Sequence, residues 1–207
     1  EKGYFDGVNK DFSFANAYAP LDFGARRYCE ARVWSYFNMF TARGNEFLPY
    51  ILGDTDTPMP LFVKPDRKIS VQDVKNAMRD HYEGTPLDIS KDFGAGPYHT
   101  PYRLSPLSFK VGDKEYFNER PISTQQSGFV FVAQMRSTLP DAIGGVLWFG
   151  TDDANMTVFT PVYCCTDKVP VCYSRVDGAD YITFSWNSSF WIFNWVSNMV
   201  YPRYDLM

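Results

Sequence analysis

Long apolar runs and clusters of positive charge are both scarce in this sequence. Its most apolar segment, 190–201, is shorter than the roughly 20 residues that a membrane-spanning helix needs, and it is interrupted by Asn194 and Asn198. Lys and Arg form no run, and the formal net charge is −4, so the sequence offers no basic surface for nucleic acid or anionic lipid. We therefore expect neither a membrane span nor a nucleic-acid partner.

Histidine is also rare, which limits the chemistry that the side chains can supply. His81 and His99 are the two histidines, and no Cys-x-x-Cys pair accompanies them, so we expect neither zinc nor another metal. Walker loops, dinucleotide-binding glycine patterns and Gly-x-Ser-x-Gly elbows are missing, and no cofactor is expected. A Ser–His–Asp triad would have to use one of the two histidines outside any recognisable motif. We interpret His81 as a core or helix-end residue.

Apolar material is nevertheless plentiful. Hydrophobic residues make up 45% of the 207 residues and aromatic residues 18%, which suffices for a packed core, and we expect one domain over 1–207. The chain starts with Glu1 rather than Met, and no signal peptide is visible at its start. We expect it to be part of a longer protein, beginning with the tail of a helix closed by Gly3.

Three of the four cysteines fall in one short stretch. Cys164, Cys165 and Cys172 lie at the end of a predicted strand and in the turn after it, and Cys29 lies in a predicted helix. We interpret these thiols as small buried groups with a packing role. A disulfide to Cys172 and free thiols are both compatible with the spacing.

Helical periodicity first occurs over 25–40. Two neighbouring i, i+4 rows run along this segment, an apolar row of Cys29, Val33 and Phe37 and a mixed row of Tyr28, Arg32 and Tyr36. The pattern predicts an amphipathic helix with Arg32 at the edge of its apolar stripe. Gly44 and Asn45 are expected to end it.

A second helix has the clearest local signature. Ser70 is an N-cap residue and Asp73 stands at the third helical position, an acidic variant of the capping box. Apolar residues then recur at helical spacing, and Gly84 is the expected C-cap. His81 falls on the apolar face of this predicted helix.

Irregular segments flank the second helix. A Pro-rich connector over 49–65 precedes it, and its Asp54 and Asp56 are interpreted as solvated acids rather than calcium ligands. A segment rich in Gly, Pro and Asp follows over 84–120. Loops of this length in compact domains often carry function.

Apolar runs in the second half of the chain predict strands. They cover 129–135, 145–149 and 157–163, with 181–186 as a fourth candidate. Such runs are typical of strands that are buried on both faces, or on one face with aromatic residues on the other. A last helix over 189–201, stopped by Pro202, is apolar nearly all round and is expected to lie between layers. This order of elements predicts a layered α+β fold.

Several motifs together resemble one enzyme family. They are Lys64-Pro-Asp-Arg-Lys-Ile-Ser70 with His81-Tyr-Glu-Gly-Thr-Pro86, Ala31-Arg-Val-Trp34, Arg120-Pro-Ile-Ser, Phe149-Gly-Thr-Asp152, Phe159-Thr-Pro-Val-Tyr163 and Trp186-Asn-Ser-Ser-Phe-Trp191. In this order they resemble the dipeptidases among the N-terminal-nucleophile cysteine hydrolases, family sixty-nine of the cysteine peptidases. The aromatic-rich version here is similar to secreted bacterial members.

The resemblance implies an αββα sandwich, of which this chain would be the C-terminal part without the N-terminal strands. It also implies hydrolysis of dipeptides by an N-terminal Cys whose own α-amino group acts as the base. Because residue one is Glu1, the nucleophile and an oxyanion-hole Asn are expected upstream. The chain alone should then be inactive. Its implied partners are a dipeptide substrate and the missing N-terminal segment, in a secreted or periplasmic protein.

Arg32 is the one residue of this chain that the resemblance places in the active site. By its position in the motif over 31–34 it resembles an Arg that related acyl-amide hydrolases hold beside the nucleophile. A guanidinium there favours the thiolate, and it can pair in two-point geometry with the carboxylate that every dipeptide carries. The alternative is a structural ion pair with an acid such as Asp22 or Glu30.

Two other functions are compatible with the sequence. The first is an acyl-amide hydrolase of the penicillin V acylase or bile salt hydrolase type, which shares the fold and the nucleophile, although the motifs over 64–86 favour the dipeptidase. The second is a non-enzymatic surface binding protein that holds peptide or glycan on aromatic loops, but Trp and Phe fall mainly in predicted strands and helices. Dipeptide preference and assembly as a homo-oligomer are left open.

Overall fold

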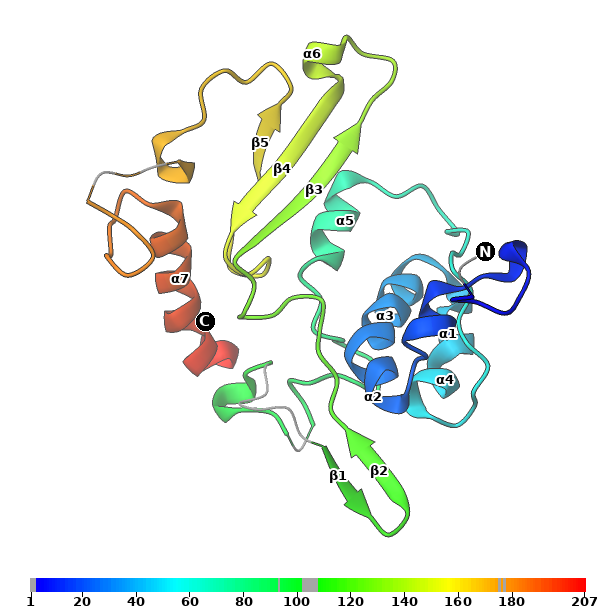
Figure 1. The fold of residues 1–207 in the computed structure, drawn as a ribbon. Coiled ribbons are helices and arrows are strands. Elements are labelled where there is room, and N and C mark those ends of the chain that lie inside the picture. Colours follow the sequence, from blue (N-terminus) through cyan, green and yellow to red (C-terminus); the bar gives the residue numbers. More distant parts are fainter. Residues whose placement is uncertain (1–2, 93, 102–107, 175, 177) are drawn as a thin grey trace.

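The computed structural model describes residues 3–92, 94–101, 108–174, 176 and 178–207. It combines helices and antiparallel strands, so the α+β class is confirmed. Figure 1 shows the helices of the first third gathered at one end of the molecule, with the main sheet at the other end and α5 between them. The final helix lies beside the sheet, on the far side from the helical end.

The helical end is built from short elements in close succession. They are α2 (Phe23–Ala25), a π-helical turn (Arg26–Glu30), α3 (Ala31–Phe40), a 3₁₀ helix (Ala42–Phe47) and α4 (Leu48–Leu52). The short α1 (Phe14–Tyr18) precedes them, in an arm formed by residues 3–22. The predicted helix over 25–40 is confirmed as a continuous helical stretch. Its α-helical part ends at Phe40 rather than at Gly44, which lies inside the 3₁₀ helix. The expected connector starts late, because Pro49 sits in the first turn of α4, where proline is tolerated.

The predicted apolar stripe on this helix is wrong. Cys29 and Val33 are exposed, whereas Ala31 and Trp34 are completely buried. The row of Cys29 and Val33 therefore faces outward, and the opposite side of the stretch, which carries Ala31 and Trp34, faces the core. Trp34 thereby enters the core, and its indole N–H donates to the carbonyl of Gly44 at 3.0 Å. The core cluster consists of Ala31, Trp34, Tyr50, Ile51, Tyr82, Leu87 and Ile89.

The capping box of α5 (Val71–Ala77) is confirmed. The backbone N–H of Asp73 donates to Ser70 Oγ at 3.1 Å, and the N–H of Ser70 donates to Asp73 Oδ2 at 2.8 Å. The helix ends at Ala77, well before the expected C-cap at Gly84. Gly84 instead takes a left-handed conformation in a later turn, with φ 74°. His81 therefore lies outside the helix.

Within 84–120, the described residues are irregular, as expected, apart from a 3₁₀ turn (Pro97–His99) and one hairpin. Strands β1 (Ser108–Val111) and β2 (Lys114–Phe117) pair antiparallel across a two-residue connection that starts with Gly112, whose φ is 60°. Such a turn favours glycine at that position. Figure 1 shows the hairpin projecting from the body below α2.

The main sheet contains three antiparallel strands in the order β3-β4-β5. Its strands are β3 (Phe129–Met135), β4 (Gly145–Thr151) and β5 (Thr160–Tyr163), and the short α6 (Asp141–Gly144) joins the first two. All three predicted strands are therefore found, with shifted ends. The fourth candidate over 181–186 is wrong, because the Asp180 carboxylate accepts the N–H groups of Ile182 and Thr183 and folds the segment into a turn.

One face of this sheet is buried and the other is apolar and open. Val130, Val132 and Val146 are buried on the side covered by α5, where Lys75 Nζ lies 3.5 Å from the Trp148 ring centroid. On the opposite face the exposed fractions are 61% for Phe129, 51% for Phe131 and 79% for Met135. Phe129 stacks on both Phe131 and Phe149 along this face. Burial on both faces is thus excluded within the described residues, and the one-sided expectation holds.

The last helix, α7 (Ser189–Val200), is confirmed and continues as a 3₁₀ turn (Tyr201–Leu206) that contains Pro202. The expectation that it lies between layers is wrong for the described chain, because Trp195 and Met199 are half exposed. The ring of Trp186 packs edge-on against Trp195, but the described residues leave this side of the helix only partly covered. None of the helices in the described part of the chain has the length and hydropathy needed to cross a membrane.

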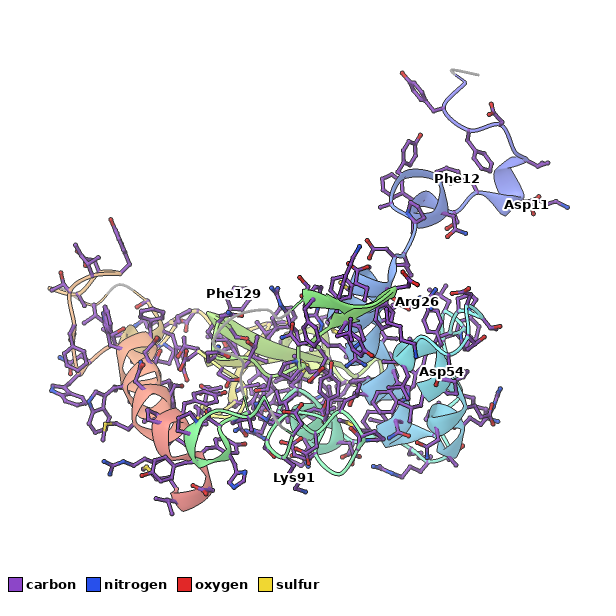
Figure 2. The ribbon with its side chains drawn as sticks, turned by 90° about the horizontal axis from the view of Figure 1, so that it is seen from below. Asp11, Phe12, Arg26, Asp54, Lys91 and Phe129 are labelled. Atoms are coloured by element: carbon purple, nitrogen blue, oxygen red, sulfur yellow. The ribbon has the colours of Figure 1, made fainter. Side chains whose placement is uncertain are left out.

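Residues 3–22 form an arm. Figure 2 shows this arm, with Asp11 and Phe12, standing away from the body on the side of the molecule that carries Phe129. Its aromatic rings contact one another, as in the Phe5–Phe12 pair, rather than the core. The helix expected before Gly3 involves residues 1–2, which lie outside the described residues, and Gly3 itself has φ 69° in a bend.

Candidate functional site

The helical stretch that carries Arg32 is held against a segment far along the chain. Burial of Ala31 and Trp34 fixes the rotation of the stretch about its axis. Arg27 and Tyr28, in the π-helical turn, then reach the segment 117–120, which follows β2. The candidate site therefore lies where the helical stretch over 26–40 meets the segment 117–120.

A buried ion pair anchors this contact. Arg27 Nη2 lies 2.9 Å from Glu119 Oε2, and both side chains are nearly inaccessible. Arg27 Nε also donates to the carbonyl of Phe117 at 3.3 Å, and the Tyr28 hydroxyl donates to Asn118 Oδ1 at 3.4 Å. Removing one partner of such a pair would leave an uncompensated buried charge, so the segment is firmly placed.

Tyr82 completes the contact from a third element. Its side chain is fully buried against Trp34, and its hydroxyl donates to the carbonyl of Arg120 at 2.6 Å. Its backbone is left-handed, with φ 65°, which is a genuine outlier for a bulky residue. Burial raises the pKa of the phenol, the Asp80 and Glu119 carboxylates raise it further, and the Arg32 and Arg27 guanidiniums oppose them. Tyr82 therefore lies within electrostatic reach of the whole site.

Asp80 is the second buried acid near this site. It accepts hydrogen bonds from Ser35 Oγ at 2.7 Å and from the N–H of Tyr82 at 3.1 Å. Burial raises its pKa to about 6, against these two hydrogen bonds, which lower it. Strongly shifted carboxyls beside a charge cluster are common at functional sites and also occur in structural networks.

Arg32 is half-buried, and no carboxylate pairs with it among the described residues. The structural alternative named Asp22 and Glu30 as partners. Asp22 instead caps α2 by accepting from the N–H of Ala25 at 2.7 Å, and Glu30 makes no ion pair within the described chain. Neither observation assigns a role to Arg32, but both remove the expected structural partner.

Arg120 is the neighbouring cation that sequence reasoning did not single out. Its guanidinium carbon lies 5.0 Å from the centroid of the Tyr28 ring, and the side chain is exposed. Like Arg32, it has no carboxylate partner among the residues that the structure describes. The sequence did contain a signal, because Arg120 opens one of the family-like motifs.

An open cleft adjoins this region on the side of the hairpin. Its cavity volume is about 640 Å³, and it is lined by Phe23, Arg26, Arg27, Leu52, Gly53, Asp54, Asp56 and residues 114–117. Asp56 pairs with Arg26 at 2.5 Å, so one of the two loop acids expected to be only solvated has a structural partner. The cleft shares Arg27 and Phe117 with the candidate site.

A separate buried network surrounds two consecutive aspartates after β4. Asp153 accepts from Ser123 Oγ and from the Tyr201 hydroxyl, and Asp152 accepts from Ser197 Oγ. Burial raises the pKa of Asp152, and the adjacent carboxylate of Asp153 adds to the rise. In the sequence, Asp152 ends one of the family-like motifs. The contacts of the two aspartates join the end of β4 to the last helix, which is a scaffold role.

The histidines form no catalytic pair. His81 is buried, as expected of a core histidine, and its Nδ1 lies 3.0 Å from Glu83 Oε1. His99 Nδ1 lies 2.9 Å from the carbonyl of Ser90. Neither ring contacts a Ser hydroxyl or a Cys thiol among the described residues. In the described part of the chain no three His, Cys, Asp or Glu side chains are placed to hold a metal ion.

The prediction that the cysteine thiols are buried is also corrected by the structure. Cys29, Cys164 and Cys165 are exposed and Cys172 is half-buried, and all four are free thiols. The turn after β5 lies at the surface, so the strand end does not bury the two vicinal thiols. The packing role is therefore wrong for the exposed cysteines, and no disulfide to Cys172 is formed.

Comparison with known proteins supplies the family context. The sequence model of Peptidase family C69 matches residues 1–207. The chain is 30% identical over 163 residues to the "Probable dipeptidase" of Salmonella dublin, an alignment covering 79% of this chain and 32% of that protein. It is 26% identical over 176 residues to "Probable dipeptidase B" of Lactococcus lactis subsp. lactis, covering 84% and 32%. It is 26% identical over 167 residues to "Dipeptidase A" of Lactobacillus helveticus, covering 80% and 29%. The chain thus spans about a third of these relatives' length.

Proposed function

The chain belongs to peptidase family C69, and we propose that the full-length protein is a dipeptidase that hydrolyses the single peptide bond of its substrate. The match over the whole chain carries this proposal, together with relatives whose names are those of dipeptidases. The structure supports it through Arg32, which is half-buried and has no carboxylate partner among the described residues.

The nucleophile of the proposed reaction is a Cys in the part of the protein outside this chain. A thiol needs a base to become a thiolate, and neither histidine of this chain contacts a cysteine among the described residues. An N-terminal Cys carries its own base in the free α-amino group. Its sulfur would attack the scissile carbonyl and release the C-terminal amino acid, and water would then hydrolyse the acyl-enzyme.

The contribution of this chain to that chemistry is Arg32. Its guanidinium would favour the thiolate of a nearby Cys or pair with the substrate carboxylate. The surrounding contacts hold this region rigidly: the Arg27–Glu119 ion pair, the Trp34 packing and the Tyr82 hydrogen bond fix the elements on either side.

The sheet supports the proposed sandwich architecture. One face of β3-β4-β5 is covered by α5, and the other presents Phe129, Phe131 and Met135 to solvent. Aromatic side chains in such a row are normally buried, because fully covering one contributes about 1.5–3 kcal/mol. In an αββα sandwich this face would pack against a second sheet, which here would come from the remaining part of the protein. A secreted or periplasmic location belongs to the same proposal.

The decisive experiment uses the full-length protein with its natural N-terminus after processing. We expect turnover of a dipeptide panel in the presence of reductant, abolished when the N-terminal Cys is replaced by Ala. The isolated 207-residue chain should be inactive. Turnover by the isolated chain that Cys29→Ala or Cys172→Ala abolishes would place the nucleophile inside this chain and overturn the proposal.

A further inference from the structure

Arg32 and Arg120 lie near Tyr28 and Tyr82 and have no carboxylate partner among the described residues. Arg79 and Arg136 also have none, but they donate to backbone carbonyls instead. Arg26, Arg27, Arg43 and Arg67 each contact a carboxylate. Two cations near the same pair of aromatic residues, without an anion among the described residues, favour binding of a negative group from elsewhere.

Shared neighbours bring the two arginines together. Arg32 follows Tyr28 by four positions on the same helical stretch, about one turn further along it. The guanidinium of Arg120 lies over the ring of the same Tyr28, at 5.0 Å. The charge of Arg32 acts to lower the pKa of the Tyr82 phenol, against the effect of burial. The hydroxyl of the same phenol donates a hydrogen bond to the backbone carbonyl of Arg120.

We infer that Arg120 and Arg32 together bind the C-terminal carboxylate of the substrate, with Tyr82 as the residue that positions Arg120. This inference rests on the proposed dipeptidase function and specifies the substrate group that the site recognises. Guanidinium N–H groups match the two oxygens of a carboxylate, and the exposed Arg120 leaves that side of the site accessible.

Two arginines that bind the substrate carboxylate would also select for substrate length. In a dipeptide the free carboxylate lies one residue beyond the scissile bond, whereas in a longer peptide that position is a neutral amide. A receptor of two guanidiniums would stabilise the carboxylate and leave the amide without an equivalent partner. Restriction to dipeptides would therefore arise at Arg32 and Arg120 rather than from the nucleophile.

The test measures kcat/KM of the full-length enzyme for one dipeptide and for its C-terminal amide, in which the carboxylate is replaced by a neutral group. The wild-type enzyme is expected to prefer the dipeptide. Arg120→Met should lower kcat/KM for the dipeptide roughly tenfold, mainly through KM, because a charge-assisted contact is lost. The amide should be unaffected. Arg120→Lys should recover part of the preference, since it keeps the charge without the planar fork.

Two further variants separate positioning from general damage. Tyr82→Phe removes only the hydroxyl that holds the backbone at Arg120, and it should reduce the preference for the dipeptide over the amide. Arg43→Met is the matched control, because Arg43 is exposed and paired with Glu46 away from this site. It should leave the preference unchanged.

The measurements distinguish failure of the carboxylate receptor from failure of the dipeptidase function. Equal losses on dipeptide and amide in Arg120→Met, or no preference in the wild-type enzyme, would overturn the carboxylate receptor and leave the dipeptidase function standing. Failure of the wild-type enzyme to turn over any dipeptide would overturn the proposed function and the inference with it.

Discussion

Replacing Asp80 by Asn should stabilise the protein at neutral pH. The Asp80 carboxyl is buried and accepts hydrogen bonds from Ser35 Oγ and from the N–H of Tyr82. Asparagine has nearly the same shape, can accept from the Tyr82 N–H through its carbonyl oxygen, and can donate to Ser35 through its amide. The substitution therefore removes the buried negative charge and keeps both contacts.

The magnitude follows from the shifted ionisation. Burial raises the pKa of Asp80 from 3.8 to about 6. Because the folded-state pKa is raised, the stability that this group contributes is fully present below about pH 4 and is lost as the pH rises through about 6. At about 1.4 kcal/mol per pKa unit, the ionised group costs on the order of 3 kcal/mol at neutral pH. The Asn variant should avoid this cost, and its advantage should fade toward about pH 4.

Urea unfolding of the full-length protein across this pH range measures the free energy of unfolding of both proteins. Asp73→Asn serves as a control of opposite sign, because hydrogen bonds from Arg67 and Ser70 hold the pKa of Asp73 well below its usual range. A group of that kind stabilises above its unfolded pKa, so its loss should destabilise at neutral pH and matter less in acid. An Asp80→Asn variant that is less stable at neutral pH, or whose advantage does not change with pH, would refute the reasoning.

Three other outcomes are expected. Arg32→Lys and Arg32→Met in the full-length enzyme should each lower kcat/KM at least about tenfold, roughly 1.4 kcal/mol, with thermal stability unchanged, and near-normal activity would make Arg32 structural. Phe131→Asp should lower the melting temperature of the full-length protein, while Tyr181→Asp, at a more exposed aromatic residue in a loop, should not. Equal effects would contradict a cover over the sheet face. Cys164 and Cys165 should be alkylated as fast in the native isolated chain as in the unfolded one, and slow native alkylation would contradict their exposure.

Features set by neighbouring residues were predictable from the sequence. The capping box of Ser70 and Asp73 depends on two residues three positions apart, and its signature is local. The strands over 129–135 and 145–149 were visible because apolar side chains continue through them. The last helix was found for the same reason, and Pro202 correctly marked where its α-helical part ends.

Features set by distant contacts were not predictable in this way. The π-helical turn over 26–30 has no composition signal, and the burial of Trp34 rather than Val33 depends on which side of the helical stretch meets the rest of the core. The partner of Arg32 could not be read from spacing either, because Asp22 was an equally good candidate until its capping role at α2 was known. Exposure of Cys164 depends on where the turn after β5 lies, which only the fold determines.

The strained backbone of Tyr82 indicates that its contact with Arg120 is maintained by the surrounding structure. Left-handed backbone at a bulky residue costs on the order of 1–3 kcal/mol, and it persists only where surrounding contacts determine it. At Tyr82 those contacts are the bond from its N–H to Asp80 and the bond from its hydroxyl to the Arg120 carbonyl, with the ring stacked on Trp34. Glycine would relieve the backbone but would lose the ring and the hydroxyl, so the native residue is the one that places Arg120 beside the helix of Arg32. The preference of a bulky residue for negative φ is thus overridden at Tyr82, where the elements of the candidate site meet. Conflicts between local backbone preference and the overall fold are expected at functional sites.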